Sequence, residues 1–292
     1  MNFLSAVLLV LKLSIFLNVL AIGLKATFAD ASSLFRQPSA LIRAFLSMNV
    51  VMPLIALALA VSINLHPAVR IALVALSVSP VPPLLPHKAI KQGGQEDYTI
   101  GLLITMALSS IVVIPAAMEV FQMSFGVPLR MSAGAIAALV MKTVLGPALL
   151  GILVHALFPM RTERIAKLVA TLGSLLLALG IIPVLFVFFR TVVDLVGDGT
   201  LLVFAGFAVV GLLFGYSLGG PGLSRKRVLA LATSSRHPGI AMAIAHTNFP
   251  NQKLVAPAIV LYLIVNALLI SLIAKKTQAK KPSTSDERPM AA

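Results

Sequence analysis

Long runs of apolar residues recur along the whole chain and restrict its fold more than any other feature. The run over residues 254–274 holds no charged side chain and shows no alternation of polar and apolar residues. An α-helix needs about 20 apolar residues to cross a bilayer, whereas a membrane β-strand alternates apolar with polar residues. Charged residues make up only 11% of the chain, well below the roughly 25% of a typical soluble protein. The sequence therefore predicts an all-α integral membrane protein whose surface contacts the lipid bilayer.

Nine such segments can be delimited, and the sequence predicts that each crosses the membrane. They cover residues 4–26, 40–63, 68–92, 97–121, 132–158, 163–190, 198–220, 225–248 and 252–274. When the loops are taken alternately, one set carries most of the cations: Arg36, Arg43, Lys88, Lys91, Arg161, Arg164, Lys167, Arg225, Lys226 and Arg227. The positive-inside rule then predicts a multi-pass protein of the plasma (inner) membrane with its N-terminus outside and its C-terminus in the cytoplasm.

The same charge pattern accounts for the net charge of +14, so no nucleic-acid partner is expected. Residues 1–274 are expected to form one transmembrane transporter domain. Residues 275–292 are rich in Lys, Pro and Ser, which predicts a disordered cytoplasmic tail. The sequence indicates no particular oligomeric state.

Enzyme chemistry finds little support in the sequence. The chain has no cysteine, which excludes disulfides and thiolate metal sites, and it has no H-E-x-x-H motif. Residues 215–219 match G-x-S-x-G, but they end an apolar span rather than a strand. With Gly211 they are interpreted as small residues for close packing inside the protein. No catalytic residue, metal or cofactor is therefore expected.

Two of the nine segments cannot be continuous helices. The third has four prolines between Pro80 and Pro86, and the eighth is interrupted by Thr233, Ser234, Ser235, Arg236 and His237 before Pro238. Each proline removes an amide donor and clashes with the preceding turn. Irregular backbone at membrane depth is tolerated only inside protein or beside a water-filled cavity. The breaks are five spans apart, which predicts two inverted repeats with a transport site at the two broken helices.

At these segments the chain resembles the bile acid:sodium symporter family over about residues 10–272. The resemblance is clearest at residues 16–24, at residues 80–94 around the first break, and at residues 236–245 after the second. It implies a panel domain of spans 1, 5 and 6 and a core domain of spans 2–4 and 7–9. It also implies that the broken spans 3 and 8 cross in the core, and that organic anions move by alternating access between the domains.

The chain departs from this family at the sodium-binding residues. By register, the family's Ser-Asn pair falls near residues 85–86, its Ser and Thr on Gly101 and Thr105, its Glu on Ala232 and its Gln on Arg236. Only Thr105 keeps a ligand type, and sodium prefers several hard oxygen ligands. A guanidinium at such a site repels the ion, so the sequence argues against sodium coupling.

Arg236 is the main candidate for substrate or ion binding. A charge at the centre of the bilayer costs roughly 2.5–3.5 kcal/mol on insertion scales, so such charges usually mark functional sites. The guanidinium could replace the sodium charge and hold the crossed helices together, or it could bind an anionic substrate. The alternative is a structural arginine satisfied by backbone carbonyls at the break.

The other candidates are polar residues near the breaks or within the spans. His237 and His87 could shuttle protons, although hydrogen-bonded histidines at helix ends are the preferred interpretation. Lys88 is either a cation of the site or a topology charge. Lys12 and Lys142 are either cavity cations or snorkelling lysines. The remaining binding candidates are Thr233, Ser234, Ser235, Thr105, Asn18 and Asn266.

These features favour a secondary active transporter of a small organic anion in which the sodium-site residues are largely replaced. A sodium-independent carrier, either proton-coupled or facilitative, or an exchanger, is the alternative. A membrane sensor or an intramembrane enzyme is a weaker one. The sequence identifies neither the substrate nor the coupling ion.

Overall fold

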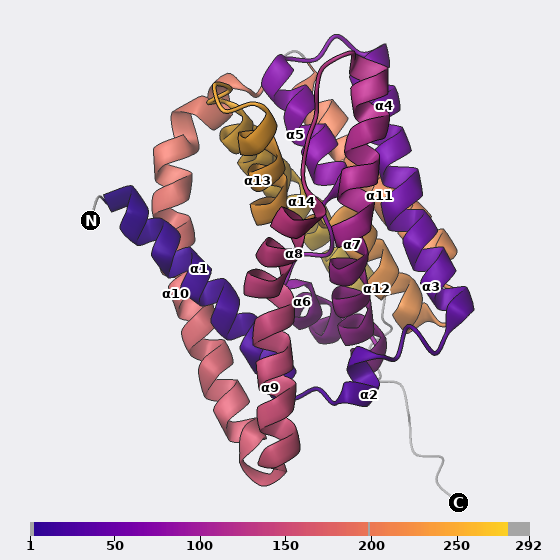
Figure 1. Cartoon of the computed structure of the whole chain (residues 1–292), viewed down its shortest axis with the longest axis vertical. Helices are drawn as coiled ribbons and strands as arrows, with labels where there is room; N and C mark the ends of the chain where they lie inside the picture. The colour runs from indigo at the N-terminus through magenta and orange to yellow at the C-terminus, as the bar shows by residue number, and fades with distance from the viewer. Residues whose placement is uncertain (1–2, 198, 280–292) are drawn as a thin grey trace, which may run out of the picture.

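The computed structural model describes residues 3–197 and 199–279, and these residues form helices without any strand (Figure 1). In chain order the elements are α1 (Phe3–Gly23), α2 (Phe28–Ala31), α3 (Pro38–Phe45), the π-helical turn η1 (Leu46–Val51), α4 (Met52–Ser62), α5 (Pro67–Val78), α6 (Leu85–Lys91), α7 (Glu96–Phe125), α8 (Ala133–Val140), the π-helical turn η2 (Met141–Leu145), α9 (Gly146–Leu157), α10 (Pro159–Asp194), α11 (Thr200–Leu218), α12 (Leu223–Ser234), α13 (Pro238–Asn248) and α14 (Val255–Ala279). The predicted all-α fold is confirmed for this part of the chain.

Seven helical runs in the described residues are long and apolar enough to cross a membrane. They are Ala6–Gly23, Pro38–Ser62, Glu96–Phe125, Ala133–Leu157, Thr162–Asp194, Thr200–Leu218 and Val255–Ile273. Each corresponds to one of the nine predicted segments. The other two predicted segments are the interrupted ones, and each consists of two shorter helices. Nine crossings and the inverted repeats therefore stay predictions.

Proline determines where the interrupted segments break. In the first, α5 ends at Val78, and Ser79 takes an extended conformation before Pro80. In the second, α12 ends at Ser234, and His237 is extended before Pro238, the first residue of α13. A residue that precedes proline is driven out of the helical region, and proline is well tolerated at the start of a helix. Both breaks therefore follow from the sequence.

Small residues bring helices together at two places. Helix α1 packs along α10 and against α9, and a Cβ atom on Gly23 would lie 2.3 Å from the carbonyl oxygen of Ala148. Helix α11 packs along α12, and a Cβ atom on Gly215 would lie 2.5 Å from the carbonyl oxygen of Leu229. The glycine motif around Gly215 thus mediates internal packing, as the sequence predicts.

The cation-rich loops gather at one end of the bundle. Arg225, in the first turn of α12, donates to the Gln95 side chain over 2.8 Å and lies 5.5 Å from the ring centre of Tyr98, near the start of α7. Arg227 reaches Gly93 at the same end. Figure 1 shows α2 and α6 at this end, whereas the loop between α4 and α5 lies at the other. The direction of the bundle across the membrane stays a prediction.

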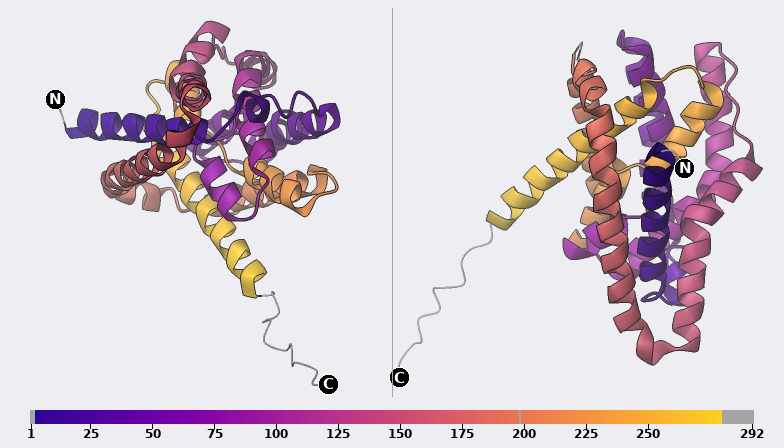
Figure 2. Two further views of the ribbon diagram at one scale, coloured as in Figure 1. Left: turned by 90° about the horizontal axis from the view of Figure 1, so that it is seen from below. Right: turned by 90° about the vertical axis from the view of Figure 1, so that its left-hand side faces the viewer.

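The last helix differs from the expected C-terminal boundary. Figure 2 shows that α14 runs obliquely to α10 and that its C-terminal end extends away from the bundle. Because α14 continues to Ala279, residues 275–279 of the expected tail are helical. Residues 280–292, the rest of that tail, lie outside the described residues.

Candidate functional site at the meeting point of the two breaks

The two interrupted segments contact each other inside the protein. The backbone amide of His237 donates to the carbonyl oxygen of Pro80 over 3.0 Å, and Nη1 of Arg236 donates to the carbonyl oxygen of Ser79 over 3.1 Å. In a continuous helix the Ser79 carbonyl would pair with the amide of residue 83, which is a proline without N–H. The second break therefore supplies donors for oxygens that the first break leaves free.

Arg236 makes a second hydrogen bond to backbone freed by proline. Its Nη2 donates to the carbonyl oxygen of Met48 over 3.2 Å. Met48 lies in the π-helical turn η1, and a π-helix pairs a carbonyl with the amide five residues later. For Met48 that partner is Pro53, which has no N–H. One guanidinium thus connects the second break to the first break and to the helix pair α3–α4.

The charge of Arg236 has no acidic partner in the described part of the chain. The side chain is fully buried, at 0% exposure, and its Nε has no hydrogen-bond partner. The one ion pair among the described residues joins the exposed Lys167 and Glu163. Both hydrogen bonds that its guanidinium makes in the described part of the chain go to backbone carbonyl oxygens, a pairing that is typical of charged side chains inside membrane proteins.

The rest of the second break forms a hydrogen-bonded polar cluster with α14. Ser234 lies 2.5 Å from Oδ1 of Asn266, and Nδ2 of Asn266 donates to Ser235 over 3.3 Å. The hydroxyl of Tyr262 donates to the carbonyl oxygen of Ser234 over 2.5 Å. The Thr233 hydroxyl lies 2.8 Å from that of Ser47, just before Met48. Four of the predicted binding residues are therefore held together around one break.

His237 occupies the N-cap position of α13. Its Nδ1 accepts from the amide of Ile240 over 3.4 Å, while Nε2 is buried and has no partner. The ring is only 1% exposed. In this arrangement the imidazole satisfies one of the amides that a helix start leaves free.

The candidates outside the second break are not all part of this cluster. Thr105 is buried on α7, and its hydroxyl has no partner. Asn18 is buried between α1 and α10, where its Nδ2 donates to the carbonyl oxygen of Ser14 over 2.9 Å. The other four, His87, Lys88, Lys12 and Lys142, have exposed side chains. Of these, His87 on α6 interacts with the backbone of Asn18 on α1.

Three residues that contribute to this site were not among the predicted site residues: Ser47 and Tyr262 in the polar cluster, and Pro53 beside the Met48 carbonyl. Tyr262 precedes Asn266 by four residues, so the two share one face of α14, and this spacing was a usable signal. Ser47 and Pro53 offered none, because a serine and a proline within an apolar span suit many roles. In the described residues no three His, Asp or Glu side chains come together as a metal site.

Comparison with known proteins gives these features a family. The sodium bile acid symporter family matches residues 12–195, more than half of the chain. The chain belongs to this family. It is also similar to a protein of Oryza sativa subsp. japonica described as a probable sodium/metabolite cotransporter, BASS2, chloroplastic. The two are 25% identical over 161 residues, which is 55% of this chain and 38% of the relative, so the matched part spans about two fifths of that relative.

Family membership makes this chain an integral, multi-pass membrane protein of a transporter family rather than an enzyme family. Ala232 and Gly101 are two of the positions at which the sequence comparison predicts that sodium ligands are replaced, and Ala232 is fully buried and has no oxygen in its side chain. A Cβ atom on Gly101 would lie 2.2 Å from the hydroxyl of Ser33. Ser33 therefore fills the space into which a serine at position 101 would extend.

Proposed function

We propose that this protein is a secondary active transporter of a small organic anion in which Arg236 takes the place of a bound sodium ion. The observation that carries the proposal is the position of this guanidinium. It is fully buried and joins the first break, the second break and the η1 turn through Ser79 and Met48. A mobile cation at such a junction stabilises it only when bound, whereas a covalently attached cation stabilises it permanently. The family's coupling to sodium is then lost.

The substrate is attracted by positive potential at the junction. The N-terminus of α13 begins at Pro238 beside Arg236, and a helix N-terminus carries about half a positive charge. Because Arg236 is fully buried, it acts on the substrate through its field rather than by direct contact in this conformation. No carboxylate in the described residues pairs with Arg236 to offset that field.

The moving parts follow from the helix packing. Helices α1, α9 and α10 pack on one another. They belong to spans 1, 5 and 6, which form the proposed panel. Spans 2–4 and 7–9 form the proposed core, in which the two interrupted segments complete nine crossings and two inverted repeats.

The test is uptake into sealed proteoliposomes across a panel of small organic acids, with sodium or potassium as the external cation. We expect at least one acid to be taken up at the same rate in both salts. A steep dependence on sodium would refute the replacement of sodium by Arg236 and leave transport intact. Absence of uptake of every acid in both salts would refute the transporter assignment for this panel.

A variant pair then tests the residue itself. Arg236→Gln is expected to abolish uptake although the purified protein remains monodisperse. Arg190→Gln changes an exposed arginine of α10 in the same way and serves as the control, with unchanged uptake. Wild-type uptake by Arg236→Gln would show that the buried cation is not required.

A further inference from the structure

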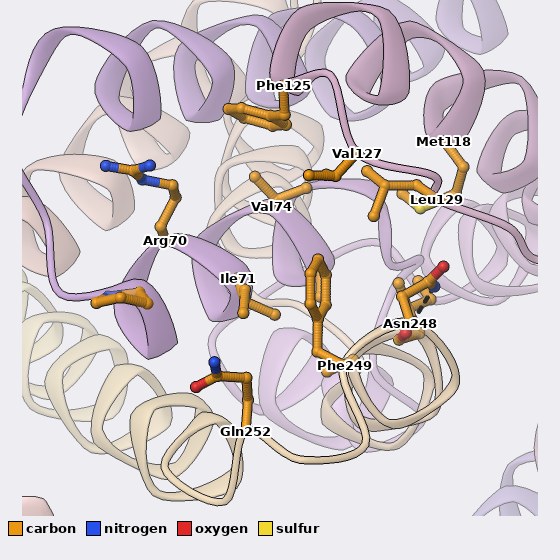
Figure 3. A pocket seen from close by; sticks show the side chains of 14 residues that line it. Arg70, Ile71, Val74, Met118, Phe125, Val127, Leu129, Asn248, Phe249 and Gln252 are labelled. Carbon is orange, nitrogen blue, oxygen red and sulfur yellow. Dashed lines mark hydrogen bonds between the residues drawn. The ribbon is translucent and has the colours of Figure 1, made fainter.

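We infer that a cavity at the end of the bundle opposite the cation-rich loops binds a compact organic anion with an apolar body. The cavity has a volume of about 270 Å³ and lies between α5, α7 and α13. Figure 3 shows Arg70 on one side of it and Asn248 on the opposite side, with Phe125 and Phe249 as aromatic walls. None of these residues belongs to the meeting point of the two breaks, so this site is separate from the proposed transport site.

The walls of the cavity suit an apolar ligand body. Ile71 and Val74 come from α5, Met118 and Phe125 from α7, and Phe249 from the residues after α13. At ~30 Å³ for each water molecule, the cavity has room for about nine waters. That volume matches a small aromatic or branched acid rather than a lipid or a steroid. Apolar walls with a few polar groups are the usual composition of small-molecule sites.

Arg70 supplies the charge that an anion requires. It lies in the first turns of α5, and its Nε is buried without a hydrogen-bond partner. Within the described residues it forms no ion pair, since the only ion pair there joins Lys167 and Glu163. A guanidinium presents parallel N–H donors that match the two oxygens of a carboxylate. The side-chain amide of Gln252 also lines the cavity and can donate to the same ligand. The Asn248 side chain lines it too, but it already donates to the Ile244 carbonyl and accepts from the Arg130 amide.

A second cavity next to the first extends the positive character of this end. It has a volume of about 310 Å³, shares Ala245, Phe249 and Gln252 with the first, and is lined in addition by His246 and Lys253. No aspartate or glutamate lines either cavity. Clefts lined by one sign of charge raise the local concentration of the opposite ion. The pair of cavities therefore attracts anions and repels cations.

Equilibrium binding tests this site independently of transport. The chain has no tryptophan, so Phe125→Trp places a single fluorescent reporter in the cavity wall. The protein is reconstituted in nanodiscs of zwitterionic lipid and titrated with benzoate, with neutral benzamide as the isosteric control. We expect a saturable change in emission with benzoate and a much weaker one with benzamide. Equal responses to the two compounds, or no saturation with benzoate, would overturn the proposal.

Charge variants in the same background identify the residue responsible. Arg70→Gln is expected to weaken benzoate binding by roughly ten- to a hundredfold, the range for loss of hydrogen bonds to a charged group. Arg190→Gln is the matched control, because Arg190 is an exposed arginine that does not line the cavity. Unchanged affinity in Arg70→Gln, or equal weakening in Arg190→Gln, would refute the role of Arg70.

A cavity-filling variant covers the case in which Arg70→Gln does not fold. Val127 lies in the loop after α7, lines the cavity and is 39% exposed, so a larger side chain there does not disturb helix packing. Val127→Phe leaves Arg70 in place and occupies the ligand space. We expect it to abolish the benzoate response. Unchanged benzoate affinity in this variant would show that the ligand does not occupy this cavity.

Discussion

The hydrogen bond between Arg236 and Met48 makes a specific prediction about Pro53. Arg236 donates to the Met48 carbonyl, to which Pro53 cannot donate. An amide restored at position 53 could donate to that carbonyl instead, and the hydrogen bond from Arg236 would then no longer be needed. Pro53→Ala restores that amide just after the η1 turn, and Arg236→Met removes the guanidinium. The two changes should therefore be energetically coupled, although Pro53 lies on α4 and Arg236 in the break between α12 and α13.

The expected coupling can be worked out from the bonds. Arg236→Met leaves the carbonyls of Ser79 and Met48 unpaired, at about 1–3 kcal/mol for each buried group. Removal of the cation also removes the free-energy cost of burying its charge, roughly 2.5–3.5 kcal/mol, and so offsets part of this loss. This gain from removing the buried charge is the same with proline or alanine at position 53, so it cancels in a double-mutant cycle. With Pro53→Ala present, only the Ser79 carbonyl stays unpaired, and Arg236→Met should be less destabilising by about 1–3 kcal/mol.

The assay is equilibrium unfolding of the four proteins of the cycle in mixed micelles, read by helical circular dichroism. Pro147→Ala is the matched control, because Pro147 follows the η2 turn as Pro53 follows η1. It should show no coupling to Arg236→Met. Independent sites add to within about 0.5 kcal/mol. Additivity to that level in the Pro53 cycle would refute the reasoning, as would equal coupling in the Pro147 cycle.

Two further predictions concern packing and the polar cluster. Gly215→Ala should destabilise the protein far more than Gly206→Ala. A Cβ at position 215 would lie 2.5 Å from the Leu229 carbonyl oxygen, whereas one at position 206 meets nothing within 4 Å. Equal melting temperatures of the two variants would contradict this prediction. Tyr262→Phe should lower the free energy of unfolding by about 1–3 kcal/mol, since it leaves the buried Ser234 carbonyl without that donor. Unchanged unfolding in micelles would show that the bond contributes nothing.

The breaks were predictable because their cause is local. Proline removes an amide and restricts the preceding residue wherever it occurs. Pro80 is therefore sufficient to place the C-terminal end of α5, and Pro238 is sufficient to place the start of α13. Polar residues in an apolar segment must be satisfied inside the protein, which is why Thr233 to Arg236 could be recognised as one group. These inferences need no knowledge of which helices are neighbours.

The contacts of the site were not predictable, because they depend on which faces meet. A helix that is apolar all round has no periodicity to indicate its buried face, so the sequence does not tell whether Lys12 or Asn18 on α1 is buried. In the structure Asn18 is buried against α10, whereas Lys12 is exposed. The Met48 carbonyl acceptor could not be predicted either, because every residue has a backbone carbonyl and the sequence does not show which one accepts from Arg236. Only the proline at position 53 marks it, and only once the π-helical turn is known.

Proline and arginine are complementary in this site. In a bilayer each unpaired backbone oxygen costs several kcal/mol, and water is absent from the hydrocarbon core to supply a donor. The prolines at positions 53 and 83 each leave one carbonyl free, and both carbonyls accept from Arg236. A buried arginine without an acid would ordinarily be a liability, but here its donors meet acceptors that would otherwise be unsatisfied. Arg236 can therefore be fully buried without an acidic partner, because its donors pair with carbonyl oxygens that the prolines leave free.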